Sequence, residues 1–189
     1  MTTEETKAVE IMKSGEWYAA DNSVIVNMLR LCQQECFEIN AIPPKDMALR
    51  NSRIASLFGH AGKGLQVNTP FNCDYGFNIH VGDNFFANFN LVILDEAEVT
   101  FGNNVFIGPN CSFYTAVHPL DTERRDANVE KSLPITVGDS VWFGGGVTVL
   151  PGVTIGSGST IGAGSVVTHD IPDNVVAVGN PCRVIKKLD

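Results

Sequence analysis

The chain has 189 residues, of which 44% are hydrophobic and 18% charged, so it can bury one core and is too apolar for wholesale disorder. Its formal net charge of −8 argues against nucleic acid as the main partner, because phosphate backbones bind net basic surfaces. No stretch approaches the ~20 consecutive apolar residues of a membrane-spanning helix, and the acidic N-terminus does not resemble a secretory signal. We therefore expect a cytoplasmic protein with neither a membrane nor a nucleic-acid partner.

The first 64 residues are mixed in composition and predict an N-terminal helical cap. Helices are expected at 3–14, 22–38 and 46–58. The second has the clearest helical spacing, and Asn22 or Ser23 can cap its start; its apolar residues are Val24, Met28, Leu31 and Cys32. The residue types then change to Gly, Val, Ile, Asn, Asp and Thr, which predicts a second unit over 65–189.

Five cysteines are present, an odd number without a C-x-x-C pair: Cys32, Cys36, Cys73, Cys111 and Cys182. This spacing fits neither a disulfide framework nor a zinc knuckle. Cys32 and Cys36 lie four residues apart in a predicted helix, so we expect them to share a core face. The pattern is typical of a reduced protein, and we expect no metal requirement.

The second unit repeats every six residues. From Val137 it divides into the hexads VGDSVW, FGGGVT, VLPGVT, IGSGST, IGAGSV and VTHDIP, and earlier copies begin at Phe101, Ile107 and, more loosely, Val81. The first position is always apolar, the second is often glycine, and the fifth is mostly small or β-branched. Such a repeat predicts a mainly β fold, a parallel β-helix whose first hexad position points inward. We expect the second-position glycine to permit the tight corner between faces.

A polar insert interrupts the repeat between Phe113 and Ile135, and we expect a loop at 114–134. Solenoids usually place insertions on a binding face. The loop contains His118, followed by Pro119, and a basic group formed by Arg124, Arg125 and Lys131. Because the prism is thin, we expect the loop to have little to pack on in its own chain and to gain order from a partner subunit.

The chain closely resembles the hexapeptide-repeat acyltransferases, and within them the maltose and galactoside O-acetyltransferases. The resemblance covers nearly the whole chain; its matching segments are GEWYAAD at 15–21, CDYGFNIHVGDNFFANFN at 73–90, TAVHPLD at 115–121, VWFGGGVTVLPGVTIG at 141–156 and VVAVGNPCRVIKKL at 175–188. It implies a left-handed parallel β-helix, a homotrimer, an active site between neighbouring subunits, and transfer of an acetyl group from acetyl-CoA to a sugar hydroxyl.

His118 is the candidate general base. An imidazole has an unperturbed pKa near 6.5 and accepts a proton at neutral pH. In the resembled family the histidine of this motif is the catalytic base, and His118 occupies that position. The other histidines, His60, His80 and His169, stand at positions typical of surface or packing residues. Cys111 could instead form a covalent intermediate, but its hexad position points inward, where apolar surroundings make a thiol inert.

Donor binding and oxyanion stabilisation are expected along the glycine run 144–146, whose backbone N–H groups lack covering side chains. The resemblance implies coenzyme A contacts at Asn88, Gly145, Ala163, Thr168, His169, Arg183 and Lys186. Gly145 stands where relatives have Ser, so only its N–H remains available. Arg183 and Lys186 can hold phosphates in an otherwise acidic chain.

For the acceptor, sugar hydroxyls need carboxylates and amides at fixed geometry. The resemblance implies Asp21, Arg30, Asp74, Asn88 and Glu96. Glu96 stands where the family often has Asp, and Asp74 stands where the galactoside branch has Ser, which favours the maltose branch. The aromatic residues that could stack on a sugar, or simply pack, are Trp17, Tyr75 and Phe86.

Three alternatives remain open. The same fold occurs in trimeric carbonic anhydrases, but zinc there needs three imidazoles and His118 has Glu123 where a companion would stand. The acceptor could be an antibiotic or an amino acid instead of a sugar. The chain could also be a non-catalytic scaffold, which the presence of His118 and of the basic tail disfavours.

Overall fold

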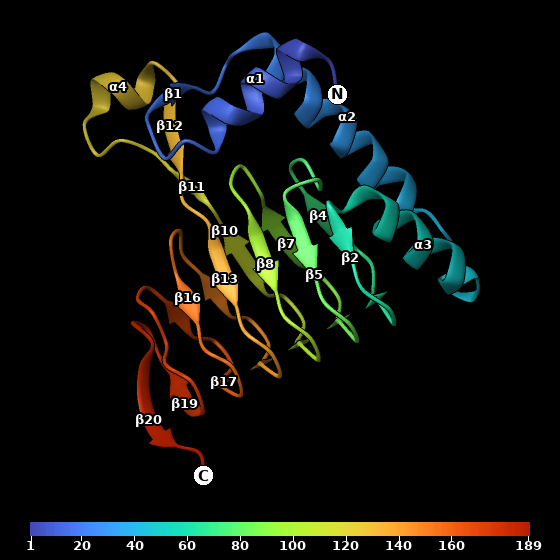
Figure 1. The fold of residues 1–189 in the computed structure, drawn as a ribbon, viewed down its shortest axis with the longest axis vertical. Coiled ribbons are helices and arrows are strands. Elements are labelled where there is room, and N and C mark those ends of the chain that lie inside the picture. The colour runs from blue at the N-terminus through green and yellow to red at the C-terminus, as the bar shows by residue number, and fades with distance from the viewer.

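Three helices cover the N-terminal end of a parallel β-helix in the computed structural model, which describes residues 1–189 (Figure 1). They are α1 (Thr3–Met12), α2 (Ser23–Asn40) and α3 (Met47–Leu57), with a 3-10 turn at Pro44–Asp46 before α3. The side chain of Asn22 caps α2 by accepting a hydrogen bond from the Val24 N–H, as expected. The C-terminus lies at the opposite end of the molecule from the cap. No helix is both long and apolar enough to cross a membrane.

Three parallel sheets form the faces of the β-helix. The first sheet contains β4 (Phe71–Cys73), β7 (Leu91–Leu94), β10 (Ser112–Tyr114), β15 (Thr148–Val149) and β18 (Val166–Val167). The second contains β2 (His60–Ala61), β5 (Ile79–Val81), β8 (Val99–Phe101), β13 (Ile135–Val137) and β16 (Thr154–Ile155). The third contains β3 (Gln66–Val67), β6 (Phe86–Ala87), β9 (Phe106–Ile107), β14 (Trp142–Phe143), β17 (Thr160–Ile161) and β19 (Val175–Val178), and β20 (Arg183–Lys187) adds to it antiparallel.

The hexad register is confirmed by the strand pairing. Thr136 pairs with Thr154 and Val137 with Ile155, so three hexads make one coil. First-position residues are buried in every hexad from Val137 to Val167. Large rings stack along the axis in the order Phe85, Phe101, Phe113, Phe143, with centroids 5.2, 5.0 and 5.2 Å apart. The predicted parallel β-helix is therefore correct.

The second-position glycines are required for a reason that differs from the expected one. Gly138 does not adopt a left-handed φ; instead, a Cβ there would lie 2.7 Å from the Ser157 backbone nitrogen of the next coil. The left-handed corner falls at the fourth position, for example at Gly146 (φ 71°) and Asn110 (φ 61°). Close approach of coils, and not the corner, therefore selects glycine at the second position.

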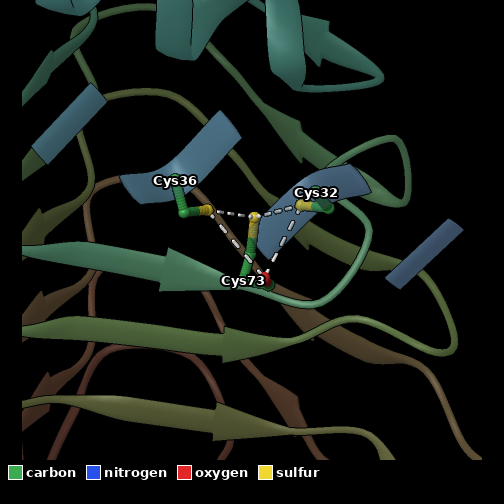
Figure 2. Close-up of side chains that lie close together, drawn as sticks. All are labelled: Cys32, Cys36 and Cys73. Atoms are coloured by element: carbon green, nitrogen blue, oxygen red, sulfur yellow. Dashed lines mark hydrogen bonds between the residues drawn. The ribbon is translucent and has the colours of Figure 1, made fainter. Parts of the chain in front are cut away.

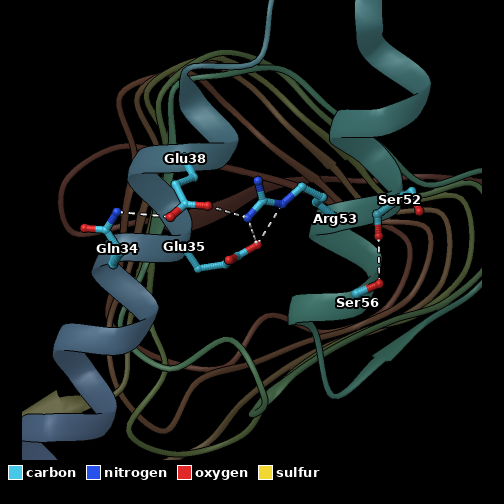
Figure 3. A network of polar contacts seen from close by, with 6 residues as sticks. All are labelled: Gln34, Glu35, Glu38, Ser52, Arg53 and Ser56. Carbon is cyan, nitrogen blue, oxygen red and sulfur yellow. Dashed lines mark hydrogen bonds and ion pairs between the residues drawn. The ribbon is translucent and has the colours of Figure 1, made fainter.

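The cap is continuous with the β-helix core. Cys32 and Cys36 of α2 share a buried face, as predicted, and this face contacts Cys73 of β4 (Figure 2). On the outer side, Arg53 of α3 pairs with Glu35 and Glu38 of α2 at 2.6 and 3.0 Å (Figure 3). The cysteine contacts hold α2 against the first coils, and the ion pairs hold α3 against α2.

The insert contains secondary structure and packs on its own chain, which corrects the expectation that it has little to pack on. It contains β11 (Ala116–Val117), α4 (Thr122–Asp126) and β12 (Val129–Ser132). β12 lies between β11 and β1 (Tyr18–Ala19) of the cap in an antiparallel sheet. The guanidinium of Arg124 lies 4.5 Å from the Trp17 ring centroid, and the Lys131 amine 5.0 Å from it. The cap segment therefore supplies the surface on which the insert folds.

Candidate active site

Two edges of the prism carry the predicted site residues. The insert edge, where the chain turns from the first sheet to the second, holds Asp74, Glu96 and the insert itself. The glycine edge, where it turns from the third sheet to the first, holds Asn88 and Gly145. Each strand ends at a turn, so the repeat places polar groups in rows along these edges.

A pair of acids forms the centre of the insert edge. Glu96 is buried, and its Oε2 lies 2.9 Å from the Thr115 hydroxyl. Burial, and then the neighbouring Asp74 carboxyl, raise the pKa of Glu96 to about 8. Burial also raises the pKa of Asp74. Glu96 therefore retains its proton near neutral pH, and the half-buried Asp74 beside the protonated Glu96 gives the pair both an acceptor and a donor for a hydroxyl.

Asp95, beside Glu96, holds the turn that positions Asp74. Its Oδ1 accepts hydrogen bonds from the N–H groups of Asp74 and Tyr75 at 3.0 and 2.9 Å, and its Oδ2 accepts one from Asn78. Burial raises the pKa of Asp95 to about 7, although the hydrogen bonds from these backbone N–H groups act to lower it. Asp95 is thus a positioning residue.

His118 follows β11 on the insert edge and is exposed. In the β11–β12 ladder Val117 faces Lys131, so the next register position places His118 toward Glu130. The hydroxyl of Tyr18 donates to Glu130. Burial raises the pKa of the Glu130 carboxyl, while the Tyr18 hydroxyl and the charge of His118 act in the opposite direction. His118 makes no hydrogen bond within the chain, so its ring is free to meet a ligand.

The two predicted acceptor residues of the cap lie at the surface. Asp21 is exposed just after β1, where the Ala20 N–H donates to the Asn128 carbonyl of the insert at 2.8 Å. Arg30 is exposed on α2 and makes no ion pair in the chain. The chain therefore places Asp21 beside the insert but does not join Arg30 to the acids.

On the glycine edge, one N–H of the glycine run is free. The N–H groups of Gly144 and Gly146 donate to the carbonyls of Ile161 and Pro109 at 2.8 Å each, whereas the Gly145 N–H has no acceptor in the chain. A surface hollow of about 310 Å³ holds Gly145, Asn88 and the ring of Phe86. Of the three backbone N–H groups expected to stabilise an oxyanion, only that of Gly145 is therefore available to a ligand.

The other residues predicted to bind coenzyme A lie on both edges. Ala163 is exposed on the glycine edge one coil beyond Gly145. Thr168 and His169 lie on the insert edge and contact each other at 2.8 Å. His169 shares a hollow of about 260 Å³ with Arg183, and Lys186 is exposed further along β20. The chain does not bring these residues into one pocket.

The aromatic residues predicted to stack on a sugar differ in how far they are exposed. Trp17 contacts the insert cations yet remains 38% exposed, whereas Tyr75 is buried against Phe77 with ring centroids 5.7 Å apart. Tyr75 is therefore a packing residue in the chain, and the exposed ring of Trp17 can still meet a ligand. Cys111 is fully buried, and burial raises the pKa of its thiol, as expected of an inert cysteine.

Three residues at the insert edge were not singled out from the sequence: Tyr18, Thr115 and Glu130. Tyr18 lies in GEWYAAD and Thr115 in TAVHPLD, so both stand inside recognisable segments, but no spacing rule links position 18 to position 130. Their juxtaposition depends on the sheet of β1, β11 and β12.

Known proteins and family models share this architecture. Residues 134–169 match the bacterial transferase hexapeptide (six repeats) model, and residues 11–62 match the maltose acetyltransferase hexapeptide capping motif. The chain is 48% identical over 153 residues to the galactoside O-acetyltransferase of Escherichia coli (strain K12), covering 81% of this chain and 75% of that protein. A maltose O-acetyltransferase structure from Clostridium difficile 630 is 45% identical with a TM-score of 0.93, covering 96% of this chain and 97% of that chain. A galactoside acetyltransferase in complex with coenzyme A is 41% identical with a TM-score of 0.92, covering 96% and 91%.

Proposed function

The chain belongs to the hexapeptide-repeat acetyltransferases of the maltose and galactoside O-acetyltransferase type, and on this basis we propose that it transfers the acetyl group of acetyl-CoA to a sugar hydroxyl. The observation that carries the proposal is the insert edge, where an exposed histidine stands beside a row of buried acids. His118 removes the proton of the sugar hydroxyl, and the oxygen attacks the thioester carbonyl directly. The carbon–sulfur bond then breaks, and His118 returns the proton to the coenzyme A thiolate.

The developing oxyanion is stabilised by the free N–H of Gly145. A well-placed donor of this kind contributes about 3–4 kcal/mol to the transition state. No covalent acetyl-cysteine is needed, because Cys111 is buried and its thiol pKa is raised.

Substrate binding is divided between the edges. Asp21, Asp74 and Glu96 bind the sugar, with Asn88 and Arg30 completing the set in the assembled enzyme. The coenzyme A path is lined by Asn88, Gly145, Ala163, Thr168 and His169. The coenzyme A phosphates are bound by Arg183 and Lys186.

Five free thiols fit a reducing compartment, which we propose is the cytoplasm.

The active form is a homotrimer with the site between subunits. His118 lies on the insert edge and Gly145 on the glycine edge, so the insert edge of one copy facing the glycine edge of the next would bring base and oxyanion donor together. Leu120, at the tip of the insert, is 95% exposed, and Trp142 beside the glycine edge is 57% exposed. Both side chains are thus available to pack against a neighbouring copy.

A free-thiol assay tests the function directly. Purified protein with acetyl-CoA is offered a panel of sugars, aminoglycoside antibiotics and amino acids, and release of the coenzyme A thiol is measured. We expect sugar-dependent release above the hydrolysis background. Release only with an antibiotic or amino acid would replace the sugar by that acceptor, and no release with any acceptor would contradict the proposed activity.

A further inference from the structure

Three buried thiols meet where the cap joins the first coils (Figure 2). The Sγ of Cys73, on β4, lies 3.6 Å from the Sγ of Cys32 and 3.8 Å from that of Cys36, both on α2. All three sulfurs lie within 4.8 Å of one another. No other group of three His, Cys, Asp or Glu side chains in the chain is placed to hold one metal ion.

The spacing of these sulfurs suits a shared ion. A metal in the plane of three sulfurs at the usual metal–sulfur length of about 2.3 Å requires the sulfurs to lie about 4 Å apart. A disulfide would use only two of the three thiols and would need those two sulfurs to approach to about 2.05 Å. We propose that Cys32, Cys36 and Cys73 form a three-coordinate binding site for a soft metal ion, monovalent copper.

The ligand set selects the kind of ion. All three donors are sulfur, and thiolates select soft ions such as Cu(I). Zn²⁺ in structural sites takes four ligands in a tetrahedron. The Cys73 carbonyl oxygen lies 3.6 and 3.9 Å from the Cys32 and Cys36 sulfurs as a weak acceptor, too far to be a fourth ligand as placed. Binding exchanges thiol protons for Cu(I), and neither sulfur nor metal changes its oxidation state.

An entry path leads from the surface to Cys32. A hollow of about 280 Å³ between the cap and the 75–77 turn is lined by Cys32 together with the thioether side chains of Met1 and Met28. Thioethers are soft ligands that suit Cu(I) and not hard cations. The hollow thus places two thioether sulfurs on the same surface depression as Cys32.

A bound ion would join the cap to the acceptor side of the active site. Cys32 and Cys36 belong to α2, whereas Cys73 directly precedes the acceptor residue Asp74. An ion that binds the folded chain and not the unfolded one raises the apparent stability. Copper binding at this cluster does not depend on the proposed acetyl transfer.

The test is anaerobic Cu(I) titration of the reduced chain against a chromogenic bicinchoninate competitor. We expect one Cu(I) per chain, a higher Tm on binding, and X-ray absorption showing three sulfurs at about 2.3 Å. Cys32→Ser and Cys36→Ser should each weaken binding by at least about tenfold. Cys111→Ser and Cys182→Ser are matched controls, because these thiols are also buried but lie outside the cluster; they should bind as the parent does.

Circular dichroism establishes whether each variant is folded. If a variant does not fold, the number of sulfur ligands found by X-ray absorption in the unmutated chain still decides the proposal. Equal affinity in the Cys36→Ser variant, or loss of binding in the Cys111→Ser or Cys182→Ser control, would overturn the proposal. Fewer than three sulfurs around the copper would do the same. So would a Cys32–Cys73 disulfide, detected as a mass loss, in place of retained copper.

Discussion

At the scale of single residues, the candidate site depends on which polar groups already have partners. Glu130 is held by the Tyr18 hydroxyl, and Asp95 by three backbone N–H groups. His118 and the N–H of Gly145 have none in the chain. Groups with partners keep the shape of the site, whereas groups without partners are available to substrates.

Replacing His118 tests its role as the base. We expect His118→Ala to lower kcat by at least about two orders of magnitude, the usual contribution of a positioned base, without a change in the fold. Steady-state kinetics with circular dichroism checks this. His169→Ala is the control, since it should raise the KM for acetyl-CoA more than it lowers kcat. Near-parental turnover in His118→Ala would remove His118 from the chemistry.

Glu96 makes stability depend on pH. The carboxyl ionises near pH 4.5 in the unfolded chain and at about 8 in the folded one. The folded state therefore holds more protons between these values, so this contribution to stability falls as the pH rises through that window. Between pH 5.5 and 8.5 we expect the Tm of the parent to fall more than that of Glu96→Gln. Melting curves at both pH values measure the difference.

The matched control is Glu98→Gln, because Glu98 is exposed and its pKa is lowered by Lys13 at 2.7 Å. That variant should keep the parental pH dependence. If Glu96→Gln also kept the parental pH dependence of the Tm, a raised pKa at Glu96 would be refuted.

At the scale of elements, the hexad encodes two different glycine requirements. Second-position glycines lie against the backbone of the next coil, and fourth-position residues turn the chain with a positive φ. Asparagine and serine fill several fourth positions, as at Asn104 and Ser140, because a short polar side chain tolerates this conformation.

The two requirements predict different costs. Gly164 has φ 70° and nothing within 4 Å of an added Cβ, so Gly164→Ala should cost about 1–2 kcal/mol of backbone strain. Gly138→Ala places a Cβ 2.7 Å from a backbone nitrogen that cannot rotate away, and we expect a larger loss. Urea unfolding of both variants measures the free energies. A smaller loss in Gly138→Ala would contradict the close-approach explanation.

The insert is held by the cap, and Tyr18 is the side chain to test. Tyr18→Phe leaves the buried Glu130 without its donor, which typically costs about 1–3 kcal/mol. We expect faster tryptic cleavage at Arg124 and Arg125 of the insert, while the β-helix stays intact. Tyr114→Phe is the control, because the Tyr114 hydroxyl makes no hydrogen bond in the chain and its loss should leave the cleavage rate unchanged.

At the scale of the whole molecule, one chain separates the parts that the proposed reaction must combine. The acids and His118 follow the insert edge, and the free N–H of Gly145 lies on the glycine edge. A single prism cannot fold one edge onto another, so we propose that a neighbouring copy supplies the second half of the site.

Assembly should therefore control activity. Analytical ultracentrifugation is expected to give a mass near three chains, and dilution to the monomer should abolish turnover reversibly. Mixing His118→Ala with Gly145→Pro, which lacks the N–H, should restore part of the activity, because some interfaces then contain both intact groups. A monomer with full activity at assay concentration would contradict the shared site.

The sequence by itself determined the solenoid, the three helices of the cap and the position of the insert. It could do so because a six-residue period states directly which side chains face inward, from Val137 through Val167. Tertiary structure alone decided that Cys73 meets Cys32 and Cys36, that Tyr18 meets Glu130, and that the insert rests on β1. These pairs join residues far apart in the chain, and their meeting depends on how coils stack and how the cap docks, which no local pattern encodes.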